Sequence, residues 1–134
     1  MPRLARPLAF TAALAVCGPL AAADAGLLAR GEQAYGRCAA CHAIEQNRTG
    51  PAHCGLFGRK AGTAPGFETY SAAMKKSGLV WTEATLARFL ANPMATVPGT
   101  TMTYLGVPEA EEREALVAWL RQATRPGKAC KPPR

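Results

Sequence analysis

Two cysteines and a histidine stand close together in the stretch RCAACHA. Cys38 and Cys41 are separated by two residues, and His42 follows the second cysteine directly. Thiol and imidazole groups at such spacing can bind zinc, form a redox-active disulfide or attach a haem covalently. The sequence around these three residues discriminates among the alternatives.

The zinc and redox alternatives lack supporting residues. A structural zinc site uses four ligands, but the chain contains neither a second C-x-x-C pair nor an H-x-x-x-H pair. A thioredoxin-like dithiol belongs to a βαβ unit, whereas the flanking sequence here has a helical pattern. In a covalent haem site each thiol adds to one vinyl group of the porphyrin, and the adjacent histidine becomes an axial iron ligand. We therefore predict one covalent haem c held by Cys38, Cys41 and His42.

The first residues, MPRLARPLAFTAALAVCGPLAAADAG, have the pattern of a secretory signal peptide. Arg3 and Arg6 precede a short apolar run, and an A-x-A-like site ends at Ala23. We expect cleavage after Ala23, which would remove Cys17 and leave the remaining chain in the bacterial periplasm. The apolar run is too short to serve as a membrane anchor. The expected organisation is a signal peptide, one domain and a tail: residues 1–23, 24–125 and 126–134.

Patterns in the remaining sequence predict helices joined by long loops. Asp24 is placed to cap the first helix, and Ser71 and Thr82 are placed to start two more. The last helix is expected within residues 108–127, whereas residues 47–66 are rich in glycine and proline and predict a loop. No segment has a convincing strand pattern. We therefore predict an all-α fold whose loops pack on the haem.

The sixth iron position requires a second donor, for which Met74, Met94, Met102 and His53 are candidates. Met74 lies in a predicted helix and Met94 follows a helix-ending proline, where methionine more often belongs to the core. Met102 lies on the turn VPGTTM, far from His42 along the chain, and could reach the opposite haem face. A thioether is a soft, neutral ligand that favours reduced iron and raises the reduction potential.

Several motifs together resemble class I cytochromes c, close to the mitochondrial type and its bacterial relatives. They follow the family order between about residues 30 and 122: GEQAYGRCAACH, TGPAHCGLFGRKAGTAPGF, YSAAMKKSGLVW, TLARFLANP, VPGTTMTYLG and EREALVAWL. The resemblance implies the class I cytochrome c fold. It also implies that the first and last helices cross where Gly31 and Tyr35 meet Leu116 and Trp119.

The same resemblance assigns roles around the haem. It implies that Met102 is the sixth ligand and that the carbonyl of Pro51 accepts the imidazole N–H of His42, which would fix the ring and raise its basicity. It places four further residues near the haem propionates: Arg59, Tyr70, Trp81 and Thr100.

The chain also departs from the family pattern. His53 and Cys54 stand where the family often has a leucine and then a histidine, so His53 would lie near the haem where an apolar residue is usual. Phe89 replaces a frequent tyrosine, and Thr101 replaces a lysine beside the ligand methionine. This chain has one more residue between Phe67 and Tyr70 than the family pattern has, so the family's propionate-side tyrosine matches Tyr70 less directly.

With both axial positions filled, the iron would have no open site for a substrate. The resemblance therefore implies a soluble one-electron carrier, not an enzyme. By family analogy it would shuttle electrons between respiratory or photosynthetic complexes, from a cytochrome bc complex to a terminal oxidase or a reaction centre. One alternative is a dedicated partner of a periplasmic dehydrogenase or reductase. Another, from a different class, is a haem peroxidase-like enzyme with a labile sixth ligand.

The net charge of the chain is compatible with more than one kind of partner surface. The chain has 16 Lys and Arg residues, and without Arg3 and Arg6 it has 14 basic residues against 9 acidic ones. No basic run is interleaved with aromatic residues, and export argues against nucleic acid as a partner. A basic docking face at the haem edge and general solubility both account for the excess. We expect a monomer without a stable membrane anchor.

Two cysteines have no role in the predicted haem attachment. Of five cysteines, Cys17 lies in the predicted signal peptide and two would hold the haem, which leaves Cys54 and Cys130. An even remainder in an oxidising compartment favours a disulfide. The alternative is a buried free thiol at position 54 and an unpaired or intermolecular thiol at position 130.

Overall fold

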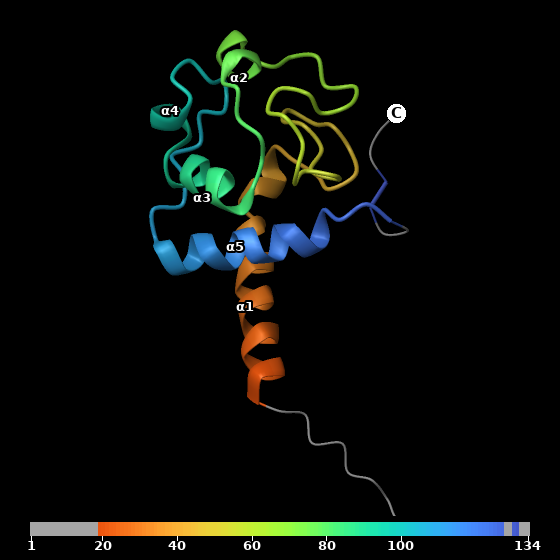
Figure 1. The fold of residues 1–134 in the computed structure, drawn as a ribbon, viewed down its shortest axis with the longest axis vertical. Coiled ribbons are helices and arrows are strands. Elements are labelled where there is room, and N and C mark those ends of the chain that lie inside the picture. The colour runs from red at the N-terminus through yellow and green to blue at the C-terminus, as the bar shows by residue number, and fades with distance from the viewer. Residues whose placement is uncertain (1–18, 128–129, 132–134) are drawn as a thin grey trace, which may run out of the picture.

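The computed structural model describes residues 19–127, 130 and 131. In this part of the chain all regular elements are helical, and two isolated β-bridges are the only strand-like pairings (Figure 1). The all-α prediction is confirmed. The helices are α1 (Pro19–Tyr35), the short 3₁₀ helix η1 (Cys38–Ala40), α2 (Ala72–Lys76), α3 (Glu83–Ala91), α4 (Pro93–Thr96) and α5 (Ala110–Ala123).

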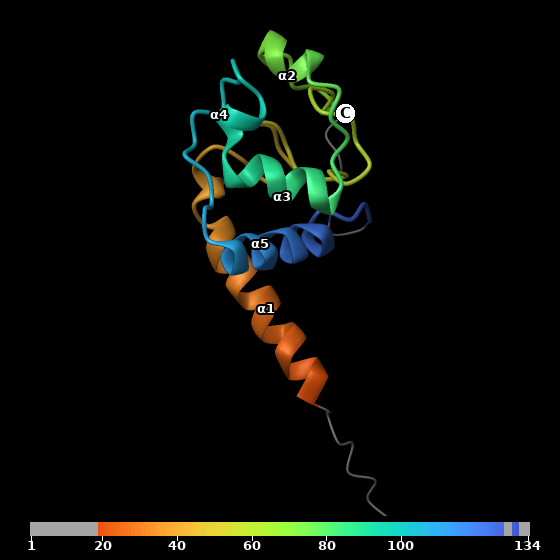
Figure 2. The same ribbon diagram turned by 60° about the vertical axis from the view of Figure 1, so that its left-hand side comes forward.

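The two longest helices, α1 and α5, cross in close contact (Figures 1 and 2). The crossing point is Gly31, where a Cβ atom would lie 2.5 Å from Cβ of Trp119 and 2.8 Å from the carbonyl carbon of Ala115. Next to it, the rings of Tyr35 and Trp119 pack with centroids 4.6 Å apart, and Leu116 is fully buried. A glycine at this position is therefore a steric requirement of the crossing, because a larger residue would collide with the backbone of α5.

Helix α1 begins earlier than the sequence predicted. It starts at Pro19, so Asp24 lies inside the helix and does not cap it. Proline is favoured in the first turn of a helix, and the alanine-rich segment after it has high helix propensity. The expected cleavage after Ala23 falls within this helix. The signal peptide remains a prediction, and residues 1–18 lie outside the described part of the chain.

The predicted starts of α2 and α3 are confirmed by their caps. The hydroxyl of Ser71 accepts a hydrogen bond from the backbone N–H of Met74, at 3.1 Å. Thr82 and Thr85 form a reciprocal capping box at the start of α3. The sequence did not predict α4, in which Asn92 caps a new helical turn immediately after α3 ends. Helix α5 spans fewer residues than the expected 108–127.

The C-terminal segment lies against the glycine-rich loop that follows the C-x-x-C-H motif. Cys54 in this loop and Cys130 in the segment are joined by a disulfide, with their Cα atoms 5.5 Å apart, and both are buried. Two backbone N–H groups add to the attachment. Gly55 donates to the carbonyl of Thr124 at 2.7 Å, and Lys131 donates to the Glu45 carboxylate at 3.0 Å.

Replacing Gly31 with alanine should destabilise the protein despite the higher helix propensity of alanine. Propensity alone favours Gly→Ala by about 1 kcal/mol, but overpacking at the crossing should cost roughly 1–3 kcal/mol or more, since backbone atoms cannot move aside. Gly26 provides the matched control, because a Cβ there would meet only the Arg30 side chain, at 3.8 Å. Denaturant unfolding should show a loss of stability for Gly31→Ala and none for Gly26→Ala; equal effects would contradict the steric account.

The disulfide should resist labelling until it is reduced. We expect an unfolded, oxidised, haem-loaded monomer to react with no thiol label, and to gain two labels per chain after reduction. The double variant Cys54→Ala/Cys130→Ala should lose about 4–5 kcal/mol of unfolding free energy in the chain-entropy model, since the bridge spans 76 residues. Two labels on the oxidised monomer would show that the bridge does not form.

Candidate haem site

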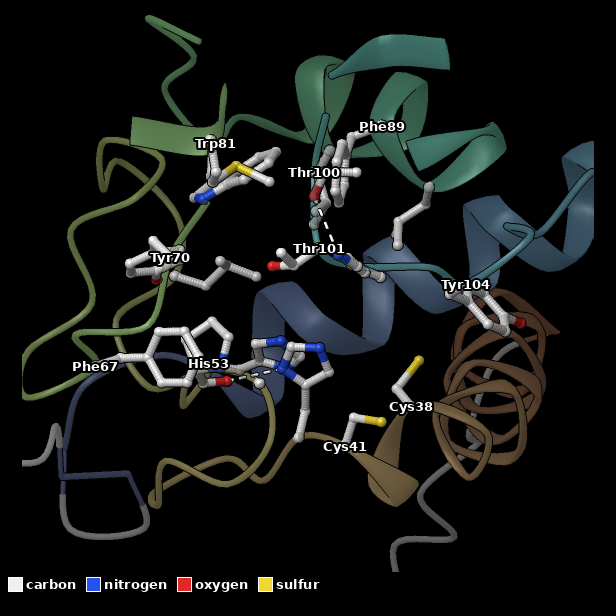
Figure 3. A pocket seen from close by; sticks show the side chains of 18 of the residues that line it. Cys38, Cys41, His53, Phe67, Tyr70, Trp81, Phe89, Thr100, Thr101 and Tyr104 are labelled. Carbon is white, nitrogen blue, oxygen red and sulfur yellow. Dashed lines mark hydrogen bonds between the residues drawn. The ribbon is translucent and has the colours of Figure 1, made fainter. Parts of the chain in front are cut away.

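A cavity of about 390 Å³ lies between the helices and the long loops (Figure 3). Its size is within the range of small-molecule and cofactor sites. The cavity wall contains aromatic and aliphatic side chains together with a few sulfur, imidazole and hydroxyl groups. All nine residues that were expected to bind or surround the haem line this one cavity: Cys38, Cys41, His42, Pro51, Arg59, Tyr70, Trp81, Thr100 and Met102.

A single tight turn brings the two cysteines and the histidine to the cavity. The η1 helix begins at Cys38, and the carbonyl of Cys38 accepts the backbone N–H groups of Cys41 and His42 at 3.1 and 2.9 Å. Figure 3 shows both cysteine side chains at the same side of the cavity. Burial raises the pKa of the Cys38 thiol, and the positive charge of Arg37 partly offsets this rise. The two thiols are therefore placed to bind one ligand.

The His42 ring is buried and held by its neighbours. Its Nδ1 donates to the carbonyl of Pro51 at 2.8 Å. Burial lowers the pKa of His42, while this hydrogen bond opposes the shift. The favoured form is thus a neutral imidazole with its proton on Nδ1, and Nε2 keeps a free lone pair suited to a metal. This arrangement matches the hydrogen bond to a backbone carbonyl that typically orients a metal-ligating histidine.

Gly50 provides space for the imidazole, a role that the sequence analysis missed. A Cβ atom at position 50 would lie 2.7 Å from both ring nitrogens of His42. The backbone N–H of Gly50 also donates to the carbonyl of Cys41 at 2.8 Å, which draws the loop against the motif. The signal that could have identified it is the Gly-Pro pair, because the glycine permits the close approach and the proline supplies the acceptor.

Met102 reaches the cavity from a different segment. Its backbone N–H donates to the hydroxyl of Thr100 at 3.2 Å, within a turn where Gly99 has a φ of 89°. Of the other candidates for the sixth iron position, His53 and Met74 also line the cavity. Met94 lies at the exposed surface and is not part of the cavity wall.

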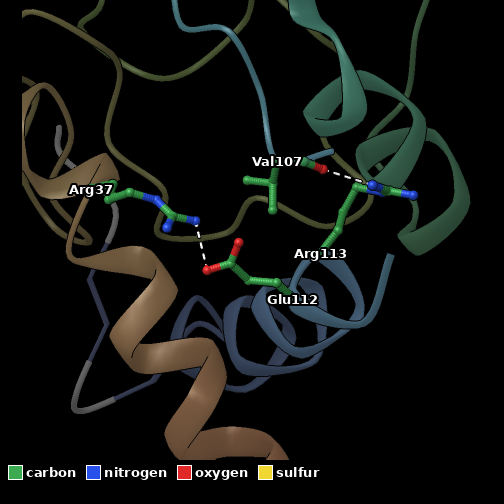
Figure 4. Close-up of polar contacts among 4 residues, drawn as sticks. All are labelled: Arg37, Val107, Glu112 and Arg113. Carbon is green, nitrogen blue, oxygen red and sulfur yellow. Dashed lines mark hydrogen bonds and ion pairs between the residues drawn. The ribbon is translucent and has the colours of Figure 1, made fainter. Parts of the chain in front are cut away.

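The segment after Met102 is anchored to two helices. The guanidinium of Arg113 in α5 donates to the carbonyl of Val107 at 2.7 Å (Figure 4). Val107 in turn donates its N–H to the carbonyl of Leu90 in α3, also at 2.7 Å. Figure 4 also shows the exposed ion pair of Arg37 with Glu112, 2.8 Å long, which joins the region after α1 to the first turn of α5. Helix α5 therefore contacts both the segment that follows Met102 and the region between α1 and the cysteines.

Arg59 carries a hydrogen-bond donor that still needs an acceptor. Its two terminal nitrogens donate to the carbonyls of Cys54 and Ala52, each at 3.0 Å. Its Nε is buried and has no hydrogen-bond partner among the described residues. Burial lowers the pKa of Arg59, but an arginine remains charged at neutral pH. A half-buried cation with a spare, buried donor in the cavity wall suits an acidic group such as a haem propionate.

His53 also lies in the cavity wall, where the family pattern has an apolar residue. Its ring stacks on that of His42, and its Nδ1 lies 3.2 Å from the Tyr35 hydroxyl. Burial lowers the pKa of His53 well below its usual value, and the neighbouring His42 and Arg59 add to this effect. Burial raises the pKa of Tyr35 to about 12, so its hydroxyl keeps its proton at neutral pH and can donate it.

Paired thiols, a neutral imidazole, a thioether and a half-buried arginine thus converge on one largely apolar cavity between helices and loops. These groups fit a covalently attached haem: the thiols can form thioethers, the imidazole and thioether can bind iron, and the arginine can pair with a propionate. The fold and the site together place this chain in the class of helical proteins that enclose a covalently attached haem.

Comparison with known proteins identifies the family. The family model Cytochrome c matches residues 28–124. Cytochrome c of Chlamydomonas reinhardtii is 46% identical over 108 residues, which cover 78% of this chain and 96% of the algal protein. Cytochrome c2 of Blastochloris viridis is 42% identical over 107 residues, which cover 78% and 81% of the two chains. The structure of cytochrome cH from Methylobacterium extorquens is 40% identical and superposes with a TM-score of 0.68, covering 71% of this chain and 97% of that one.

The chain belongs to the cytochrome c family. The predicted fold is therefore confirmed as the class I cytochrome c fold. As a member of this family it carries a covalently attached c-type haem and takes part in electron transport.

Loss of the Arg59 charge should lower the reduction potential. A nearby positive charge disfavours the more positive oxidised haem, so Arg59→Gln should lower the potential by roughly tens of millivolts. Arg125→Gln is the matched control, because it removes the same charge from an exposed residue outside the cavity. Spectroelectrochemical titration checks both variants, and equal potentials for Arg59→Gln and the wild type would show that Arg59 does not act on the haem.

Proposed function

We propose that the protein is a one-electron carrier whose haem is attached through Cys38 and Cys41 and ligated by His42 and Met102. The observation that carries this proposal is the convergence of these four side chains on one cavity, although Met102 is far from the others in the sequence. Among the described residues, Met74 is the other methionine in the cavity wall, and it lies within helix α2.

The bound haem supplies an iron centre that alternates between Fe(III) and Fe(II). The protein side chains tune this centre and protect it. The Pro51 carbonyl fixes the proton of His42 on Nδ1 and so presents Nε2 for ligation. The thioether of Met102 favours the reduced state and denies exogenous ligands a coordination site. The apolar wall limits the access of water, which raises the potential further.

The relatives and the sequence also support a proposal for the cell compartment and the partners. Proteins named cytochrome c2 from several bacteria match this chain, and its first residues have the signal-peptide pattern. Both support a periplasmic carrier that links a cytochrome bc complex to a terminal oxidase or a reaction centre, or that serves one periplasmic dehydrogenase. In the described part of the chain, no helix has the length and apolarity to cross a membrane. We propose that the protein acts as a monomer.

A haem enzyme is the second candidate. A peroxidase-like reaction requires a vacant or labile sixth position on the iron, and the position of Met102 in the cavity wall argues against this requirement. The packing of the methionine loop on α3 and α5 also argues against ready dissociation. We therefore favour the electron carrier.

Substitution of Met102 tests the ligand assignment. Met102→Ala should leave the haem covalently attached, lower the reduction potential and allow the iron to bind added ligands such as imidazole or cyanide. Visible spectra should also lose the methionine–iron band. Met94→Ala is the control, because this exposed methionine lies outside the cavity. A spectrum and potential of Met102→Ala that match the wild type would refute the assignment and shift attention to Met74 and His53.

A further inference from the structure

The stacked pair of histidines is a feature that the proposed electron-carrier function does not require. The ring centroids of His42 and His53 lie 4.3 Å apart, and the ring planes are inclined by 23°. His53 lies in the wall of the cavity (Figure 3). One flat ring therefore lies over the face of the histidine that we assign as the axial ligand.

His53 is held in this place at both its backbone and its side chain. Its backbone N–H donates to the carbonyl of Ala43 at 3.0 Å, so it lies beside the residue that follows His42. The next residue, Cys54, donates to the carbonyl of Ile44 at 2.6 Å and is joined to Cys130. The chain segment that carries His53 is thus tied to the segment that carries His42 and to the C-terminal segment.

The His53 side chain is held from helix α1. The Tyr35 hydroxyl contacts its Nδ1 at 3.2 Å, and the two rings meet edge to face with centroids 5.8 Å apart. Tyr35 itself is buried at the crossing of α1 and α5, against Trp119. A rigid helix contact therefore determines the position of the ring that covers His42.

Two different contacts then restrain the His42 imidazole. The Pro51 carbonyl accepts the Nδ1 hydrogen bond at 2.8 Å and so restrains the direction in which Nδ1 points. This single hydrogen bond does not by itself fix the plane of the ring. A ring stacked on its face opposes rotation of that plane, because turning would drive the edge of one imidazole into the other. Together the two contacts restrain both the direction of Nδ1 and the plane of the ring.

We propose that His53, held by Tyr35, is a positioning residue that fixes the plane of the axial imidazole of His42. The proposal rests on the proposed function, in which His42 ligates the haem iron. The orientation of an axial imidazole plane governs how unpaired electron density is distributed over an oxidised low-spin haem, and contacts to a ligand tune its metal. His53 thus shapes the electronic structure of the haem without binding the iron.

Two substitutions at position 53 test the proposal in the haem-loaded protein. His53→Leu removes the flat ring, whereas His53→Phe keeps one. Proton NMR of the oxidised protein should show a changed order or spacing of the haem methyl resonances for His53→Leu, and a smaller change for His53→Phe, which keeps a flat ring but loses the hydrogen bond to Tyr35. A wild-type pattern in His53→Leu would overturn the proposal, as would equal displacement in both variants, since the stacked ring would then not be the cause.

Tyr35→Phe provides a second test, and it changes the protein less than either substitution of His53. It removes only the hydroxyl that holds His53, so it should move the same methyl resonances in the same direction by a smaller amount. If His53→Leu fails to acquire haem, this variant decides the question, and an unchanged pattern would overturn the proposal. The methionine–iron band of the wild type tests the proposed ligation separately, so its absence would contradict the proposed function and not the role of His53 alone.

Discussion

The close contact of α1 with α5 at Gly31 is the constraint on which the rest of the structure depends. Because no side chain fits between the helices at this point, the end of α1 lies firmly against α5. The C-x-x-C-H motif begins three residues after α1 ends at Tyr35, so its position follows from the crossing. Helix α5 also holds the loop that carries Met102, through the bonds of Arg113. One helix pair therefore positions both sides of the haem site.

The loops around the site are ordered by specific bonds and not by regular structure. The glycine-rich loop approaches His42 at Gly50, and the carbonyl of Pro51 in this loop accepts the hydrogen bond from His42 Nδ1. Arg59 returns to the same loop and bonds the carbonyls of Ala52 and Cys54. The disulfide then joins this loop to the C-terminal segment. Such loops can contact a planar ligand closely from several directions.

Electron transfer benefits from this rigidity. A site that keeps the same geometry in two oxidation states needs little rearrangement when an electron arrives or leaves. The bonds to His42 and the anchored methionine loop restrict movement on both sides of the cavity. The protein thus combines a largely apolar cavity wall with a few polar contacts that hold His42 and the segments around it.

Much of the site could be predicted from short segments of the sequence. The spacing of Cys38, Cys41 and His42 is a local property, because a turn of four or five residues determines their relative positions. The starts of α2 and α3 were equally predictable, since the hydroxyls of Ser71 and Thr82 bond to N–H groups only three residues away. The start of α1 was not, because favourable helix-forming residues continue upstream of Asp24 and a potential cap does not by itself end a helix.

Contacts between distant segments required the tertiary structure. Local sequence left several possible donors for the sixth iron position, and only the folded chain separates Met102 in the cavity wall from the exposed Met94. The space beside Gly50 and the ring stacked by His53 depend on where one loop meets another. The sequence by itself determined the attachment chemistry, because that chemistry depends on residue types at short spacing. Only the tertiary structure decided which groups surround His42, because those contacts depend on helix packing that brings residues together from far apart in the chain.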